Sequence, residues 1–299
     1  MQMAHPGLPE FDYIRPGTLM EASRFLADHP DEARIFLGGT DMFVRMRDGA
    51  WTAKYLVDVK GLHGTNELHY SSAHGLVVGA AVNMNRLISS PDVQNYYQLL
   101  VEAAHSVASY QLRTRATIIG NICNASPAGD TTGACIVLGG ILKVHGLNGY
   151  REESLSTFFK GAGKTILKPG DVVTSIHFPV PQEGAAGKYL KLGRNAIGDL
   201  SIVGVTVFGY RDNNTVSGYR FKIALASVAP IPFVPVQAEA VLAEKPISKE
   251  TVDEAAQFAM DACTPIDDIR GGAKYRKQMV RNLTRNGLHE VISRLGLKI

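Results

Sequence analysis

The sequence contains few cysteines, no long apolar run and no large excess of charge of one sign. The three cysteines (Cys123, Cys135 and Cys263) cannot all pair, and none belongs to a Cys-X-X-Cys motif. We therefore expect a reducing compartment, the cytoplasm, and neither a structural zinc nor an iron–sulfur cluster in this chain. No window approaches the roughly 18 consecutive apolar residues of a membrane span. The first ten residues contain prolines and lack the charged-then-apolar pattern of a signal peptide.

Several catalytic and binding motifs are also missing. The formal net charge of +3 is too small to indicate nucleic-acid binding. The histidines form no His-X-His or His-X-X-X-His grouping, so no metal site is expected. Without a G-x-S-x-G sequence, nucleophilic hydrolysis has no support. Without a G-x-G-x-x-G sequence after a strand, any dinucleotide must bind outside a Rossmann fold.

One glycine-rich segment resembles a nucleotide-triphosphate loop without completing it. Gly161-Ala162-Gly163-Lys164-Thr165 carries the Gly-Lys-Thr ending, but Phe158 occupies the position of the first glycine. We expect a simple connecting loop here.

The order of apolar segments predicts three units, at 1–59, 60–178 and 179–299. The first two alternate short strands with helices, and Thr18 and Glu21 are spaced as a capping box at the start of the first helix. The Pro- and Gly-bearing segment 179–184 separates them from the third unit. There, 189–192, 201–210 and 219–228 predict a three-stranded antiparallel sheet, and 251–263 and 275–295 predict helices.

Two glycine-bearing turns about eighty residues apart are the most informative motifs. Each of Leu37-Gly38-Gly39-Thr40-Asp41 and Thr117-Ile118-Ile119-Gly120-Asn121 follows an apolar run. Glycines let successive N–H groups converge on an anion and keep side chains away from it. Either motif alone could be a tight turn, but together they predict one dinucleotide held between two segments.

Two further features each have two interpretations. Asp130 is the one carboxylate in the small, neutral stretch 125–133. It could accept hydrogen bonds from ribose or ribitol hydroxyls, or it could be the N-cap of the helix that follows. The basic segment 275–283 could be a solvated helix face, or it could dock onto an acidic partner subunit.

The motifs, taken in order, resemble the flavin-binding (medium) subunit of the molybdenum hydroxylases, the carbon monoxide dehydrogenase and xanthine dehydrogenase family. The similarity covers nearly the whole chain. Its most specific parts are the two glycine motifs, Gln111-Leu112-Arg113, and Asn124-Ala125-Ser126-Pro127-Ala128-Gly129-Asp130; a looser match is Lys191-Leu192-Gly193-Arg194 with Asp199-Leu200-Ser201.

The resemblance implies an α+β protein with a non-Rossmann FAD-binding fold of the vanillyl-alcohol-oxidase (PCMH) type. Two α/β subdomains would carry FAD, followed by the three-stranded antiparallel sheet with a helical bundle. The first motif and the second would wrap the pyrophosphate, and Asp130 would reach the ribityl or ribose hydroxyls. Val173 would line the adenine side, with Lys191 and Leu200 near the isoalloxazine. The full set of implied cofactor-binding residues is Ile35, Phe36, Leu37, Gly38, Gly39, Thr40, Asp41, Met42, Val107, Thr117, Ile118, Ile119, Gly120, Asn121, Asp130, Val173, Lys191 and Leu200.

The function implied by the resemblance is an electron relay with no substrate chemistry in this chain. A large subunit with a molybdenum pterin cofactor would hydroxylate the substrate, and two [2Fe–2S] clusters in a small subunit would pass the electrons to FAD. NAD⁺, a quinone or O₂ would be the external acceptor. The alternatives are a self-contained flavin reductase or oxidase, and a scaffold that has lost FAD. The second arises because Ile119 stands where the family usually has a glycine, and isoleucine would be costly there if φ were positive.

Overall fold

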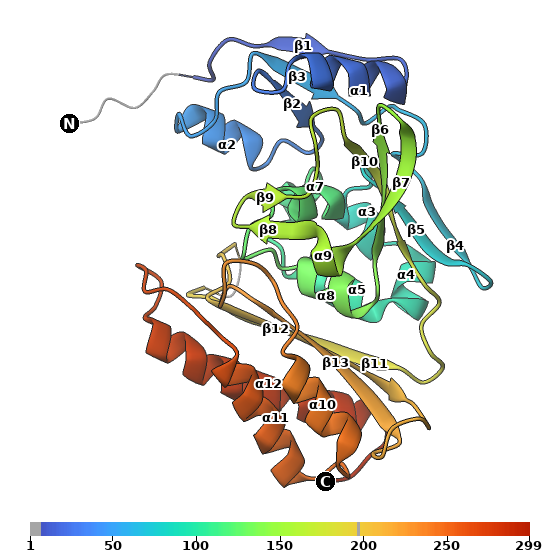
Figure 1. Ribbon diagram of the computed structural model, residues 1–299, viewed down its shortest axis with the longest axis vertical. Helices are drawn as coiled ribbons and strands as arrows, with labels where there is room; N and C mark the ends of the chain where they lie inside the picture. The colour runs from blue at the N-terminus through green and yellow to red at the C-terminus, as the bar shows by residue number, and fades with distance from the viewer. Residues whose placement is uncertain (1–6, 196–197) are drawn as a thin grey trace.

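The computed structural model describes residues 7–195 and 198–299. The chain forms three layers along the long axis of the molecule, with the N-terminal unit, the middle unit and the C-terminal unit following one another (Figure 1). Among the described residues, no helix has the length and hydrophobicity needed to cross a bilayer.

The N-terminal unit is a small parallel sheet with helices beside it. Its strands are β1 (Asp12–Ile14), β3 (Tyr55–Asp58) and β2 (Ala33–Phe36), in that spatial order. Helix α1 (Leu19–Asp28) begins as predicted, because Thr18 Oγ1 accepts a hydrogen bond from the Glu21 amide at 3.1 Å. The Glu21 carboxylate accepts a hydrogen bond from the Gly17 amide, whereas in a complete capping box it would accept from the Thr18 amide. Helix α2 (Met42–Arg47) follows the first glycine motif directly.

The middle unit is built on a five-stranded antiparallel sheet. Its spatial order is β4 (Leu68–Ser71), β5 (Gly75–Gly79), β10 (Val172–Phe178), β6 (Ile141–Gly146) and β7 (Gly149–Ser154). The helices are α3 (Met84–Ile88), α4 (Pro91–Tyr96), α5 (Gln98–His105), α6 (Tyr110–Arg113), α7 (Ile118–Cys123), α8 (Thr132–Val137) and α9 (Leu155–Phe158). The triphosphate-like segment forms the hairpin of β8 (Phe159–Gly161) and β9 (Lys164–Thr165).

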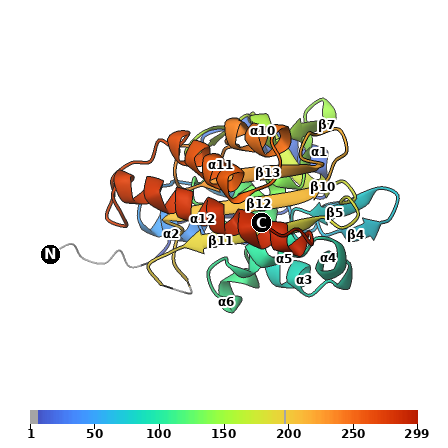
Figure 2. The same ribbon diagram turned by 90° about the horizontal axis from the view of Figure 1, so that it is seen from below.

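The C-terminal unit contains the predicted antiparallel sheet, with β12 (Val203–Arg211) between β11 (Ala186–Leu192) and β13 (Tyr219–Ala226). Helices α10 (Val236–Glu244), α11 (Lys249–Asp261) and α12 (Ala273–Arg294) pack on one face (Figure 2), and α5 and α8 pack on the other. Helix α8 approaches so closely that a Cβ on Gly133 would lie 2.4 Å from Thr206 Oγ1. Because both faces are covered, β12 is an apolar run without a solvent-facing alternation. Helix α10 was not predicted from the sequence.

Candidate cofactor-binding site

A cavity of about 540 Å³ lies between the two glycine motifs. This volume is within the range of about 300–1,000 Å³ that is usual for small-molecule and cofactor sites. All of the residues implied by the resemblance line it except Phe36, Ile118 and Lys191. The predicted residues in the lining are Ile35, Leu37, Gly38, Gly39, Thr40, Asp41, Met42, Val107, Thr117, Ile119, Gly120, Asn121, Asp130, Val173 and Leu200.

The two glycine motifs come together because Gly38 has no side chain. A Cβ at Gly38 would lie 2.2 Å from the carbonyl oxygen of Arg115, just before the second motif. Gly39 has a φ of +73°, and a Cβ there would meet the ring of Phe36 at 2.6 Å. The first motif therefore turns sharply over Phe36 and lies directly against the chain that enters the second motif.

The first motif presents unpaired donors to the cavity. Within the described residues, the backbone amides of Gly38, Gly39, Thr40 and Asp41 have no protein acceptor. Successive free N–H groups beside a residue with positive φ form the kind of concavity that binds phosphate oxygens. Asn124 also lines the cavity, and its buried Oδ1 has no hydrogen-bond partner among the described residues. This oxygen can therefore accept a hydrogen bond from a ligand hydroxyl. Both features fit a ligand that carries a diphosphate and hydroxyl groups.

The second motif is the beginning of α7. Thr117 is its N-cap, and Thr117 Oγ1 accepts from the Gly120 amide at 2.9 Å. Ile119 lies within this helix, is not among the residues with positive φ, and its side chain is buried in the main apolar core. Isoleucine is therefore not strained at this position. The positive φ that would have made Ile119 unfavourable for cofactor binding is absent.

Three of the predicted residues lie behind the lining. The ring of Phe36 packs against Gly39, and Ile118 is buried in the core of the middle unit. Lys191 Nζ donates to the Asp130 carboxylate at 2.8 Å and to the carbonyl oxygen of Ser106 at 3.1 Å. The Lys191 ammonium group therefore does not line the cavity itself but binds a lining residue, Asp130.

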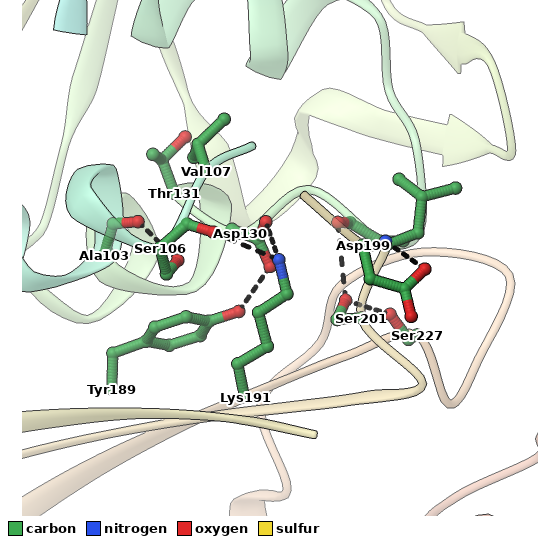
Figure 3. A network of polar contacts seen from close by, with 12 residues as sticks. Ala103, Ser106, Val107, Asp130, Thr131, Tyr189, Lys191, Asp199, Ser201 and Ser227 are labelled. Carbon is green, nitrogen blue, oxygen red and sulfur yellow. Dashed lines mark hydrogen bonds and ion pairs between the residues drawn. The ribbon is translucent and has the colours of Figure 1, made fainter. Parts of the chain in front are cut away.

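Asp130 is held from both sides by strand β11 (Figure 3). Its Oδ1 accepts from the phenol of Tyr189 at 2.7 Å, and its Oδ2 accepts from Lys191. The N-cap of α8 is Thr131, which makes no side-chain cap bond, so the interpretation of Asp130 as the N-cap is wrong. The local sequence pattern resembled a cap, but two partners from a strand about sixty residues further on hold the carboxylate instead.

Burial is the main influence on the ionisation of this group. It raises the pKa of Asp130, and the charge and hydrogen bonds of Lys191 and Tyr189 oppose the rise. Burial beside this carboxylate also raises the pKa of the Tyr189 phenol well above its usual value. The phenol therefore remains a hydrogen-bond donor.

The remaining turns around the cavity are strained and firmly anchored. The non-glycine residues with positive φ in the described chain are Ala108, Ala125 and Ser227, and Ala108 lies in the lining itself. The Ser227 amide donates to the carbonyl of Pro127, and the buried guanidinium of Arg276 donates to the carbonyl of Ser227. Backbone strain of this kind is often found at functional sites. Arg276 thus holds a turn and does not belong to a solvated face.

One wall of the cavity, residues 167–171, carries no motif that predicts it from the sequence. In this wall, the Asp171 carboxylate forms a bidentate ion pair with the Arg151 guanidinium, with N–O distances of 2.6 and 2.8 Å. Burial alone would raise the pKa of Asp171, but the hydrogen bonds and charges of Arg151 and the Lys168 amide outweigh it and lower the pKa. The pairing of Arg151 with Asp171 depends on the hairpin β6–β7, which a local pattern does not show.

Asp199 and Leu200 also line the cavity. The side chain and amide of Arg194 lower the pKa of Asp199 to about 2. Leu200 lines the cavity and is 55% exposed, so its apolar side chain borders both the cavity and the solvent.

Known proteins share this arrangement over the whole chain. Residues 9–181 match the FAD binding domain in molybdopterin dehydrogenase, and residues 188–291 match the CO dehydrogenase flavoprotein C-terminal domain. The chain is 32% identical to the carbon monoxide dehydrogenase medium chain of Hydrogenophaga pseudoflava, covering 96% of this chain and 98% of that one. It is 26% identical to the xanthine dehydrogenase FAD-binding subunit of Escherichia coli O157:H7, with the same coverage.

A solved structure gives the same result. The carbon monoxide dehydrogenase of Hydrogenophaga pseudoflava, in a form lacking the Mo-pyranopterin moiety, matches with a TM-score of 0.91 at 32% identity, covering 96% of this chain and 99% of that chain. The expected α+β, non-Rossmann fold is confirmed by this match. The chain therefore belongs to the family of FAD-binding subunits of molybdopterin dehydrogenases, and it is an oxidoreductase subunit whose cofactor is FAD.

Proposed function

We propose that this chain binds one FAD with its diphosphate between the two glycine motifs and uses it to relay electrons. The observation that carries the proposal is the contact of Gly38 with the Arg115 carbonyl, together with the free amides from Gly38 to Asp41. The contact brings two distant backbone segments to one point, and the free amides supply donors without side-chain bulk.

We assign the two ends of the cavity to the two ring systems of FAD. Val173, in the wall near residues 167–171, would contact the adenine. Val107 and Leu200 would cover the isoalloxazine, with the Asp130–Lys191 pair at the same end. Bound FAD accepts and releases electrons, and the protein contributes orientation, an apolar cover and nearby charge.

The electrons would come from a partner. We propose a small subunit with [2Fe–2S] clusters as the donor, a large subunit with the molybdenum cofactor as the site of substrate chemistry, and NAD⁺, a quinone or O₂ as the acceptor. Two relatives are described as carbon monoxide dehydrogenase medium chains, which supports a multi-subunit assembly. The three cysteines are free thiols, in agreement with a reducing, cytoplasmic location.

We retain the division into 1–59, 60–178 and 179–299 as part of this proposal. The parallel sheet ends at Asp58, the last strand of the five-stranded sheet ends at Phe178, and the C-terminal sheet begins at Ala186. The first two units would carry FAD between them, with the third closing one end.

The test is to titrate the purified chain with FAD and then to assay it with and without its co-purifying subunits. We expect one FAD per chain, reduction of the flavin by the reduced iron–sulfur partner, and no hydroxylation by the isolated chain. A chain that takes up no FAD, or one that hydroxylates a substrate alone, would refute the proposal.

A further inference from the structure

We propose that Tyr189 is a positioning residue for Asp130, so that the C-terminal sheet fixes the orientation of a carboxylate in the FAD cavity. This inference rests on the FAD site proposed above and adds a residue outside the cavity lining to it. Tyr189 lies in the C-terminal unit, whereas Asp130 lies between α7 and α8 of the middle unit.

The geometry assigns one carboxylate oxygen to each of two side chains from the same strand. Tyr189 and Lys191 are two positions apart on β11, so they project to the same side of the strand. The phenol reaches Oδ1 and the ammonium group reaches Oδ2 (Figure 3). With both oxygens engaged, the carboxylate cannot rotate freely, yet each oxygen keeps a lone pair for a ligand hydroxyl.

The ring of Tyr189 packs in the apolar core, whereas its phenolic hydroxyl binds Asp130. The Tyr189 side chain is 5% exposed and belongs to the apolar core of the middle unit. Its hydroxyl passes close to Gly204, where a Cβ would lie 3.2 Å from the oxygen. Phenylalanine would fill the same space, so the packing would remain, while the hydrogen bond to Asp130 and the contact of the hydroxyl with the Ser106 side chain would be lost. The carboxylate would then be held by Lys191 alone, on one oxygen, and could turn away from the cavity.

The same strand offers a matched control. Lys188 on β11 forms an ion pair with Glu102 of α5, and Glu102 also accepts from the Tyr189 amide at 3.3 Å. These contacts join β11 to α5 without touching Asp130. The substitution Lys188→Met therefore weakens the attachment of the strand and leaves the carboxylate with both of its donors.

The experiment compares FAD affinity in the full-length wild type, Tyr189→Phe, Lys188→Met, Asp130→Asn and the Tyr189→Phe/Asp130→Asn double variant. Affinity is measured by flavin titration from pH 5 to pH 8, and thermal unfolding of each apo chain is recorded. We expect Tyr189→Phe to weaken FAD binding about tenfold, because a carboxylate that can turn away from the cavity no longer makes a full hydrogen bond to the ligand hydroxyl. Lys188→Met should change the affinity less than about twofold.

The pH profile provides a measurement that a purely structural role would not change. The hydrogen bond from Tyr189 opposes the rise in the Asp130 pKa that burial causes, with Lys191 the other opposing group. Its loss should raise this pKa further, so the affinity of Tyr189→Phe should begin to fall at a higher pH than in the wild type. Lys188→Met should keep the wild-type profile, and in the Asp130→Asn background Tyr189→Phe should have no further effect.

Two results would overturn the inference. One is an unchanged FAD affinity and pH profile in Tyr189→Phe. The other is a loss of the same size in the Asp130→Asn background, which would show that Tyr189 acts independently of the carboxylate. If the wild type itself bound no FAD, the proposed function would fail first, and that result is distinct from both.

Discussion

Replacing Gly38 with alanine should separate the two glycine motifs. The new Cβ would lie 2.2 Å from the Arg115 carbonyl oxygen, about 0.8 Å inside the shortest contact that Cβ atoms normally make. Both groups belong to backbone, so a side-chain rotation cannot relieve the clash. We expect Gly38→Ala to reduce the free energy of unfolding of the apo chain by about 1–3 kcal/mol, as overpacking usually does. The displaced amides should weaken FAD binding by at least about tenfold.

Two other glycines separate the effect on folding from the effect on the ligand. A Cβ on Gly120, which also lines the cavity, would meet only Thr117 Oγ1, at 3.0 Å. Because alanine favours a helix over glycine by about 1 kcal/mol, Gly120→Ala should keep or raise apo stability while its methyl group weakens FAD binding. Gly61→Ala has open space around the Cβ and is the neutral control.

Urea unfolding of the apo chains and flavin fluorescence titrations provide the two measurements. Gly38→Ala should lose both stability and affinity, Gly120→Ala only affinity, and Gly61→Ala neither. If Gly38→Ala kept wild-type stability and bound FAD as tightly, the close approach of the two motifs could not be the basis of the site.

Three further predictions concern other parts of the cavity and its supports. Arg151→Met should lower the free energy of unfolding by about 1 kcal/mol at pH 7, since Arg151 is partly exposed. The pKa of Asp171 is lowered in the folded chain, so its stabilising effect exists above the unfolded value near 4 and disappears as the pH falls; the difference between wild type and variant should shrink by pH 3, and a pH-independent difference would contradict this. Trp51 is the single tryptophan and lines the cavity, so FAD should quench the intrinsic fluorescence in proportion to occupancy, and unchanged emission at saturation would show that FAD binds elsewhere. Arg276→Met should destabilise the chain by about 2–4 kcal/mol in urea unfolding, because Asp268 loses its ion-pair partner and the carbonyl of Ser227 loses a buried donor; a loss below about 0.5 kcal/mol would contradict the anchoring role.

Features that depend on neighbouring residues could be predicted from the sequence. The cap of α1 at Thr18, the turn at Gly39 and the strands of the C-terminal sheet have local causes, namely a hydroxyl at the N-cap, freedom at φ and apolar runs separated by turn residues. The second glycine motif was predicted as a turn, but it is the first turn of α7. Helix α10 was missed because its apolar residues do not form a single stripe with a polar opposite face.

Features that depend on distant residues could not be predicted in this way. Of the two interpretations of Asp130, the N-cap was wrong because the partners of the carboxylate come from β11, and a local pattern does not show such distant partners. One signal was present: the period of two along a strand puts Tyr189 and Lys191 on the same side. Nothing in the segment around Arg276 distinguishes this buried arginine from the exposed basic residues beside it.

Because β10 lies at the centre of the five-stranded sheet, this sheet cannot be completed before residues 172–178 have been synthesised. This strand, residues 172–178, pairs with both β5 and β6, so those two strands keep unpaired edges until the ribosome has delivered it. Unpaired edges invite association with other nascent chains, which favours chaperone binding at this stage. The last residue of the cavity lining is Leu200, later still in synthesis. The complete lining of the cavity therefore exists only after two thirds of the polypeptide has been made.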